Sequence, residues 1–411
     1  MRGVVEGFYG LPWIEEDRRD VMAMLGDKGL SHYLYGPKDA PGFREGWRAP
    51  FAAEDLRRLE QMQRMAERYG LTLGIALSPG LDIDFRNPAE ITVLERKFRQ
   101  LHAVGIFWHG LFWDDIDPLG SPRDLDQFPN PGHAQAWVTN QLAQTLPSSN
   151  PNSPWVFCPT EYWGVYESSY REAVRTTLAA DIGVIWTGPE ICSGQLTRVD
   201  AERVREQFGH PLVIWDNYPV NDAEMVHELH LGPLEGRAPD LFEVVAGYLA
   251  NPMDRAQASL IPLATITRYV SDPRTYDPWK AWSAALDYWG QAYHPMLERL
   301  GQATLYSCCR RETEISDAFY QAHRKGVPPS PDAVEAVLAW GSVTLDAFPR
   351  PLHAEIAPWV EKLRVVALWL EAVMNQDVDT AQQWQAQAAH NESLVYGGTV
   401  ELWLRNVAWT K

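Results

Sequence analysis

Short apolar runs alternate with amphipathic segments between residues 3 and 265, and this alternation constrains the fold more than any other feature. The runs are Gly3–Glu6, His32–Tyr35, Leu71–Leu77, Gly110–Trp113, Trp155–Cys158, Gly183–Trp186, Leu212–Trp215 and Ser259–Thr265. Most are continuously apolar, which is typical of parallel strands buried on both faces. Amphipathic stretches such as Asp55–Arg68, Ile91–Val104 and Ala201–Phe208 lie between them, as in βα units. Eight such units predict an α/β protein with a (β/α)8 barrel.

Polar and turn residues follow seven of these runs directly. They are Gly7–Gly10, Pro37–Asp39, Ser78–Gly80, Asp114–Asp115, Pro159–Tyr162, Thr187–Pro189 and Asp216–Asn217. In a (β/α)8 barrel the carboxyl ends of all strands meet on one face, and active sites form there. The sequence therefore predicts a functional site on this face.

The remainder of the chain changes character, and we predict a barrel over residues 1–294 followed by a helical domain over residues 295–411. A linker at Gly326–Asp332 precedes helical periodicity in Ala333–Leu345, His353–Val373 and Asp379–Ala389. Five tryptophans are expected to fill the helix packing seams: Trp359, Trp369, Trp384, Trp403 and Trp409. This domain is a candidate homodimer contact.

Composition excludes several classes of partner. The 411 residues carry a net charge of −18, which argues against nucleic acid or an anionic membrane, because phosphate binding needs a basic face. The four cysteines form no disulfide framework and have no metal-ligand spacing. No apolar stretch is long enough to span a bilayer. Strand-like sequence from Gly3 leaves no room for a signal peptide, so a cytoplasmic location is expected.

Adjacent aspartates, Asp114 and Asp115, end the apolar run Leu111–Trp113. Neighbouring side chains of a strand point to opposite faces, so both acids can reach one substrate only where the strand has ended. Two like charges this close cannot both ionise easily, which favours a proton donor beside a carboxylate. Paired carboxylates with these roles are typical of glycoside cleavage.

Other interpretations of these residues are structural or metal-binding. Asp115 to Asp126 has partial EF-hand spacing, but prolines interrupt it and position 12 is Asp rather than Glu. Asp117, which precedes a proline, would serve equally as a capping residue. His227 and His230 lie three residues apart on an expected helix, but no third ligand is placed nearby, so a zinc site is not expected.

Eight motifs in order make the chain similar to glycoside hydrolase family 84, which contains the protein O-GlcNAcases and the related hyaluronidase-like β-N-acetylglucosaminidases. They are Gly3–Trp13, Tyr35–Asp39, Ser78–Ile83, Asp114–Asp117, Cys158–Tyr162, Trp186–Pro189, Trp215–Asn217 and Asn251–Pro252. The likeness covers about residues 3–290. One such motif would be weak evidence for the family, but eight motifs in the family order are specific evidence for it.

The resemblance implies retaining, exo-acting hydrolysis of a terminal β-linked N-acetylglucosamine, without a cofactor or metal. Catalysis would be substrate-assisted: the substrate's own acetamido oxygen attacks the anomeric carbon and forms an oxazoline. Asp114 matches the residue that orients and polarises the acetamido group. Asp115 matches the general acid and base. The implied substrate is a β-N-acetylglucosaminide, with O-GlcNAc-modified protein as a candidate.

The resemblance also implies substrate-binding roles for seven further residues. They are Gly7, Lys38, Tyr162, Trp215, Asn217, Asp222 and Asn251. Tyr162 would donate its hydroxyl to the acetamido oxygen, Asn217 would position the acetamido group and Asp114, and Trp215 would offer an apolar face. Lys38, Asp222, Asn251 and the Gly7 carbonyl would bind sugar hydroxyls.

Each of four residues also has a structural interpretation. Lys38 would suit a salt-bridged rim, Asp222 a helix N-cap, Trp215 the barrel core, and Asn251 a turn.

Three departures from the family pattern affect substrate preference rather than the reaction. Ala223 follows Asp222 where relatives have tyrosine, Gly36 replaces the usual alanine, and the segment around Pro262 lacks a His-Thr pattern. Two competing functions are a catalytically silent sugar- or glycoprotein-binding module and an endo-glycosidase acting on a hyaluronan-like polymer. The acidic chain argues against the polyanion, and the intact aspartate pair argues against the silent module.

Overall fold

The computed structural model describes residues 1–117, 128–146, 154–311 and 313–407. These residues form two compact units. The barrel unit comprises residues 1–220, 236–256 and 266–276, and the helical unit comprises residues 221–235, 257–265 and 277–411. Both units draw on more than one stretch of chain, whereas we predicted domains divided by one cut after residue 294. That division stays a prediction.

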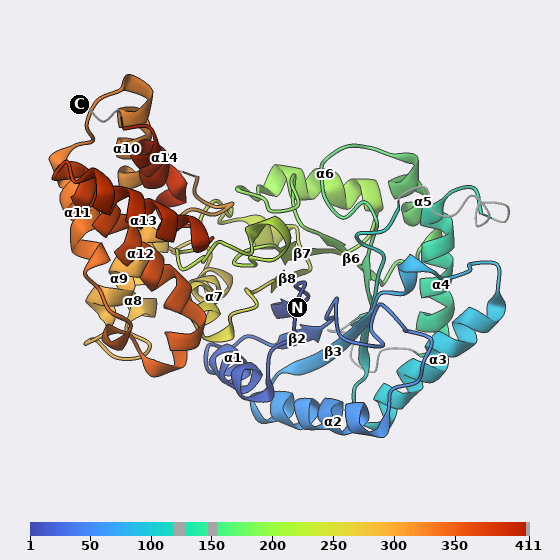
Figure 1. Cartoon of the computed structure of the whole chain (residues 1–411). Helices are drawn as coiled ribbons and strands as arrows, with labels where there is room; N and C mark the ends of the chain where they lie inside the picture. The colour runs from blue at the N-terminus through green and yellow to red at the C-terminus, as the bar shows by residue number, and fades with distance from the viewer. Residues whose placement is uncertain (118–127, 147–153, 312, 408–411) are drawn as a thin grey trace. The chain divides into compact units, whose positions relative to one another are not determined.

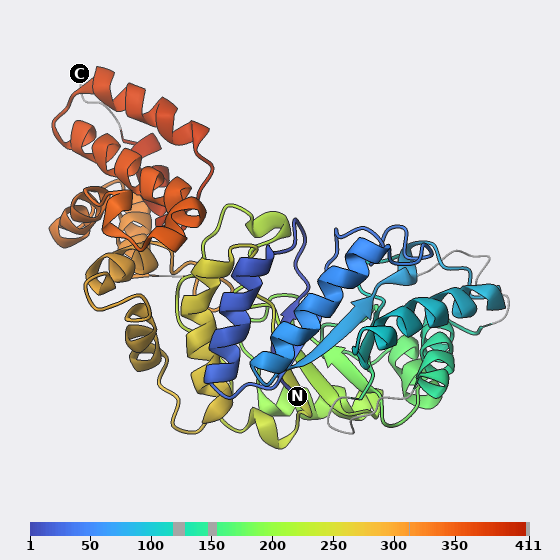
Figure 2. The same ribbon diagram turned by 90° about the horizontal axis from the view of Figure 1, so that it is seen from below.

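The barrel unit contains a closed, eight-stranded parallel barrel, so the predicted fold class is confirmed. Its strands, each paired with the next and the last with the first, are β1 (Arg2–Glu6), β2 (His32–Tyr35), β3 (Thr72–Leu77), β4 (Trp108–Phe112), β5 (Val156–Cys158), β6 (Gly183–Trp186), β7 (Leu212–Asp216) and β8 (Gly247–Ala250). The helices that follow β1 to β6 are α1 (Glu15–Asp27), α2 (Ala53–Arg68), α3 (Pro88–Ala103), α4 (Pro131–Thr145), α5 (Ser169–Thr177) and α6 (Arg198–Phe208). They lie outside the strands in both views (Figures 1 and 2).

The eighth predicted strand, Ser259–Thr265, was wrong. These residues lie within helix α7 (Ala256–Ser271), and the eighth strand is the shorter segment Gly247–Ala250. A short apolar run fits a buried helix as well as a buried strand, because burial on all sides removes the periodicity that distinguishes them. Residues 217–246, all described, connect β7 to β8 through two 3-10 helices, Ala223–Met225 and Leu241–Glu243, in place of an α-helix.

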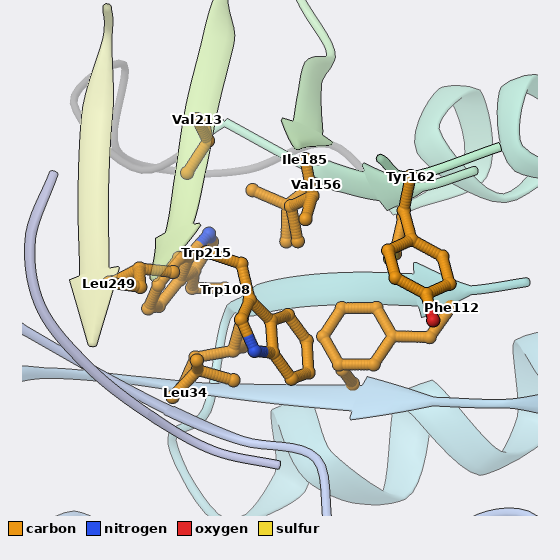
Figure 3. Close-up of a cluster of buried hydrophobic side chains, with 12 residues drawn as sticks. Leu34, Trp108, Phe112, Val156, Tyr162, Ile185, Val213, Trp215 and Leu249 are labelled. Carbon is orange, nitrogen blue, oxygen red and sulfur yellow. The ribbon is translucent and has the colours of Figure 1, made fainter. Parts of the chain in front are cut away.

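Side chains from several strands fill the barrel interior. Trp108 and Phe112 from β4, Val213 and Trp215 from β7, and Leu249 from β8 belong to one buried cluster (Figure 3). The rings of Phe112 and Trp215 lie 5.2 Å apart between centroids in an edge-on arrangement, which aromatic pairs prefer over a face-to-face stack. These side chains fill the barrel interior below the face where the strands end.

Buried carboxylates end two of the strands and hold the loops that follow. Glu6, the last residue of β1, pairs with Arg18 at 2.7 Å and accepts a hydrogen bond from the Trp13 backbone at 3.1 Å. Asp216, the last residue of β7, pairs with Arg237 at 2.8 Å. Such pairs replace the hydration that each ion loses on burial. The loops after β1 and β7 are therefore held by charge as well as by packing.

The helical unit is assembled around its longest helix. Its helices are α8 (Pro278–Leu286), α9 (His294–Ala303), α10 (Glu314–Lys325), α11 (Pro331–Gly341), α12 (His353–Met374), α13 (Val378–His390) and α14 (Thr399–Arg405), so the predicted helical character is confirmed. Trp359, Trp369 and Trp403 are buried as expected. Trp384 is only half-buried, and Trp409 lies outside the described residues.

No helix in the described ranges combines the length and the apolarity that crossing a bilayer requires.

Candidate active site

Asp114 and Asp115 follow β4 directly, on the face where the strands end. The backbone of Trp113 is held on both sides: its N–H donates to the Cys158 carbonyl at 2.8 Å, and its carbonyl accepts from the Thr160 hydroxyl at 2.8 Å. Asp115 then adopts a left-handed backbone with φ of 54°. Non-glycine residues rarely adopt this conformation, although aspartate tolerates it better than most. The turn leaves Asp114 buried and Asp115 exposed.

The Asp114 carboxylate is 7% exposed, and its two oxygens have different surroundings. Oδ2 accepts a hydrogen bond from the Lys38 ammonium. Oδ1 is buried and has no hydrogen-bond partner among the described residues. A buried acceptor without a donor costs about 1–3 kcal/mol, so this oxygen is suited to receive an N–H from a bound molecule.

One of our interpretations placed Lys38 on the rim of the site. Lys38 is only 3% exposed, so that placement is wrong. Its salt bridge is nevertheless present, and its partner is Asp114. The ammonium also lies 5.3 Å from the ring centre of Phe112 and 5.6 Å from that of Trp215. Aromatic faces stabilise a cation that has lost its water.

Asp115 is bound by two tyrosine hydroxyls, one on each carboxylate oxygen. Tyr9 donates to Oδ2 at 2.8 Å, and Tyr162 donates to Oδ1 at 2.7 Å. Burial, followed by the negative charge of Asp115, raises the pKa of both phenols above the usual value near 10. Both hydroxyls therefore keep their protons at every physiological pH and act as hydrogen-bond donors.

A chain of amide contacts joins three further strand ends. The Asn217 side-chain oxygen accepts from the Trp215 indole N–H at 2.8 Å and from the Asn251 side-chain amide at 3.0 Å. The Asn251 oxygen in turn accepts from the Gly7 backbone N–H at 3.4 Å. A Cβ at Gly7 would lie 2.5 Å from the Trp215 ring, so glycine is required there for the ring to approach. Asn251 and Trp215 are both buried, and Trp215 belongs to the core cluster as well as to this chain.

The structure thus brings together eight of the nine predicted site residues within the barrel unit: Gly7, Lys38, Asp114, Asp115, Tyr162, Trp215, Asn217 and Asn251. Asp222 belongs to the helical unit. It occupies the N-cap position of the 3-10 helix Ala223–Met225, as predicted, but its side chain does not cap that helix. The expected helix under His227 and His230 is absent from this described segment, because the 3-10 turn ends at Met225.

Sequence reasoning missed three residues that contact the site. Tyr9 lies inside the first motif, where its position just after a strand was a usable signal. Phe112 was treated only as part of an apolar run. The Arg44 guanidinium donates to the Tyr9 hydroxyl oxygen and to the Asp115 carbonyl. Arg44 lies in the loop after β2, but beyond the strand-end residues Pro37–Asp39 that drew attention to that loop.

Within the described residues, no cluster of three or more His, Cys, Asp or Glu side chains is arranged to hold a metal ion. The EF-hand-like spacing from Asp115 to Asp126 falls mostly on residues 118–127, which lie outside the described ranges.

Comparison with known proteins matches this arrangement to a family. A sequence profile described as β-N-acetylglucosaminidase matches residues 2–301. Protein O-GlcNAcases of Rattus norvegicus and Mus musculus are each 36% identical over 273 residues, which are 65% of this chain and 29% of theirs. The chain therefore matches less than a third of the length of these relatives.

A solved structure extends the likeness beyond the barrel. A mutant of the O-GlcNAc hydrolase of Thermobaculum terrenum superposes with a TM-score of 0.89 and 28% identity, over 99% of this chain and 94% of that one. The resemblance inferred from the motifs is confirmed: this chain belongs to the β-N-acetylglucosaminidase family of glycoside hydrolases, family 84.

Proposed function

We propose that this protein is a retaining exo-β-N-acetylglucosaminidase that cleaves terminal β-linked N-acetylglucosamine by substrate-assisted catalysis. The observation that carries the proposal is the asymmetry of the aspartate pair. Asp114 is buried against a lysine, and one of its oxygens has no hydrogen-bond partner within the described ranges, whereas Asp115 is exposed and held by two hydroxyls. Two adjacent carboxylates in such different surroundings suit two different tasks.

Asp114 would receive the N–H of the substrate's acetamido group on Oδ1. The Lys38 ammonium lies against the other oxygen of the same carboxylate and leaves Oδ1 available to the substrate. A negative charge at the N–H increases the electron density on the acetamido oxygen. That oxygen then attacks the anomeric carbon, forms the oxazoline and expels the aglycone.

Asp115 would protonate the departing oxygen and later take a proton from the water that opens the oxazoline. Its Oδ1 accepts from Tyr162 in this structure. When the Tyr162 hydroxyl donates instead to the acetamido oxygen, Oδ1 is released and can carry the transferred proton. Tyr162 would thus serve the nucleophile and the acid in turn.

The remaining residues would shape the sugar pocket. Asn217 and Asn251 hold each other beside Trp215, and we assign them to the acetamido group and to sugar hydroxyls respectively. Lys38 and the Gly7 carbonyl are assigned to hydroxyl binding, and Trp215 to an apolar contact. The hydroxyl-binding role of Asp222 stays a prediction.

The experiment that tests this function is hydrolysis of aryl and alkyl β-N-acetylglucosaminides by wild type, Asp114→Asn and Asp115→Asn. Asp114→Asn should lose activity on both substrates by at least about 100-fold. Asp115→Asn should lose far more on the alkyl substrate, because an aryl oxygen leaves without a proton. Progressive fluorination of the N-acetyl group should slow wild type, since it weakens the internal nucleophile.

Three results would overturn the proposal. Insensitivity to fluorination would exclude substrate assistance. An inert wild type that still binds N-acetylglucosamine would favour the sugar-binding module, and cleavage confined to internal bonds of a hyaluronan-like polymer would favour the endo-glycosidase.

Further proposals concern the natural substrate, the location in the cell and the oligomeric state. We propose an O-GlcNAc-modified protein as substrate, because the rat and mouse relatives are protein O-GlcNAcases. We propose a cytoplasmic location because all four cysteines are free, as in a reducing compartment. A homodimer through the helical unit stays a prediction, and light scattering would test it.

A further inference from the structure

We propose that Arg44 is a positioning residue for the general acid, acting through Tyr9 and through the backbone of Asp115. This inference rests on the proposed function, in which Asp115 protonates the leaving group. Arg44 lies outside all eight family motifs quoted above. Its guanidinium donates through Nη1 to the Tyr9 hydroxyl oxygen and through Nη2 to the Asp115 carbonyl at 2.8 Å.

The guanidinium fixes the direction of the hydrogen bonds that reach Asp115. Arginine only donates hydrogen bonds and stays charged at every accessible pH. The Tyr9 oxygen accepts from it, so the single Tyr9 proton is free to point to Asp115 Oδ2 at 2.8 Å. Without Arg44 the hydroxyl could rotate and accept instead. The arrangement keeps Oδ2 as an acceptor and leaves Oδ1 as the oxygen that carries the proton.

The same side chain holds the unusual backbone of Asp115. A left-handed φ of 54° is costly for a residue with a Cβ and persists only where surrounding contacts impose it. The Nη2 bond to the Asp115 carbonyl is one such contact. Arg44 also lies over the Tyr9 ring, 5.5 Å from its centre. One guanidinium therefore orients the carboxylate from its backbone and from its side chain.

The loop that carries Arg44 is held rigidly enough for this task. The buried Lys97 ammonium on α3 donates to the carbonyls of Gly42 at 2.5 Å, Trp47 at 3.0 Å and Ala49 at 2.8 Å, which uses all three of its donors. The Phe43 carbonyl, next to Arg44, accepts from the Ser78 backbone at 2.9 Å. Positioning groups are effective when their own support is fixed.

The experiment compares Arg44→Met, Arg44→Lys and Tyr9→Phe with wild type on β-N-acetylglucosaminides of graded leaving-group acidity, from 2,4-dinitrophenyl through 4-methoxyphenyl to methyl. Arg44→Met should lower kcat/KM on the methyl glycoside by about 10- to 100-fold, a share of what a general acid contributes. On the dinitrophenyl substrate the loss should stay under about threefold, since that oxygen leaves without a proton. Tyr9→Phe should show the same gradient. Arg44→Lys should recover only part, because an ammonium lacks the fork that reaches two acceptors.

Arg48→Met is the matched control. Arg48 lies in the same loop but pairs with Asp82 and Glu90 instead, so its loss should lower the melting temperature without changing the leaving-group gradient. Equal losses on all leaving groups in Arg44→Met, or the same gradient in Arg48→Met, would overturn the positioning role. Two controls test the proposed function separately: wild type must cleave the substrates, and Asp115→Asn must show the steep dependence on leaving-group acidity. If it does, the proposed function stands whatever Arg44 does; if wild type cleaves none of the substrates, both proposals fall.

Discussion

Lys38 in the barrel unit and Lys362 in the helical unit are each 3% exposed, and each pairs with a carboxylate that is 7% exposed. Lys362 donates to the carbonyls of Ala388 at 2.8 Å and Asn391 at 2.6 Å and pairs with Glu401 at 3.0 Å. Glu401 also lies 3.5 Å from Arg405. Around Asp114, by contrast, one buried oxygen has no partner in the described residues.

Under the proposed function, the difference separates an ion pair that only supports the fold from an ion pair that also binds substrate. Burying an ion pair is costly, and it is tolerated where hydrogen bonds satisfy every group. Among the described residues, Lys362 and Glu401 have no buried side-chain atom that lacks a hydrogen-bond partner. Asp114 has one such atom. A buried unsatisfied group calls for an explanation, and under the proposed function it is the acceptor for the substrate's acetamido N–H.

The largest effect is expected from Lys38→Met. Loss of the ammonium leaves Asp114 buried and unpaired, so we expect about 3–5 kcal/mol of lost stability and a fall in kcat/KM on the order of 100-fold. Urea unfolding measures the loss of stability, and hydrolysis of a 4-nitrophenyl substrate measures the fall in kcat/KM. Lys38→Met with Asp114→Asn should regain stability but not activity. Full activity in Lys38→Met would remove the distinction between the two lysines.

Lys362→Met tests the other half of the comparison. It should cost a similar 3–5 kcal/mol or so, because it leaves the buried Glu401 with only the longer ion pair to Arg405 and removes the donor to two carbonyls. At temperatures where the variant stays folded, kcat/KM should match wild type within about twofold, since the helical pair contributes only to stability. A selective loss of kcat under those conditions would show that Lys362 also serves the reaction.

Gly36→Ala restores the residue usual in the family and tests how tightly the barrel packs around Lys38. The added Cβ would lie 2.7 Å from Phe112 and 3.2 Å from Ala76, so we expect a loss of about 1–3 kcal/mol. Activity should fall as well, because Phe112 lies under the Lys38 ammonium. Adding Phe112→Leu should recover part of the stability; no recovery would mean that crowding is not the cause.

The smallest effect concerns two neighbouring histidines, His102, which is half-buried, and His109, which is fully buried. His109 Nε2 lies 2.8 Å from His102 Nε2, and burial lowers the pKa of both rings, that of His109 strongly. The unfolded chain binds protons below about pH 6.5 while the folded chain does not, so stability falls as pH falls. His109→Phe should reduce this dependence by up to about 1.4 kcal/mol per pH unit. Unfolding curves at pH 7 and pH 5 would measure it, and an unchanged slope would contradict the assignment.

Strand positions were predictable wherever polar turn residues followed an apolar run. Asp114 was found because it follows a strand, and parallel strands place their carboxyl ends on one face. Lys38 and Asn217 also follow strands, but their roles were inferred from the family resemblance. Ser259–Thr265 was misassigned because its apolar character fits both a buried helix and a buried strand. Arg44 was not found, since its distance along the chain from any strand end hides its contact with Asp115.

The sequence alone determined the barrel, its functional face and the adjacent carboxylates, because strand periodicity and turn chemistry are local properties. Only the tertiary structure decided that Asp114 is the carboxylate buried against Lys38 and that Asp115 is the carboxylate held by two tyrosines. It also decided that Arg44 reaches the Asp115 backbone. Those outcomes depend on a left-handed turn at Asp115 and on loops brought together by barrel closure. Burial and hydrogen-bond partners arise from contacts between residues distant in sequence, which no local pattern encodes.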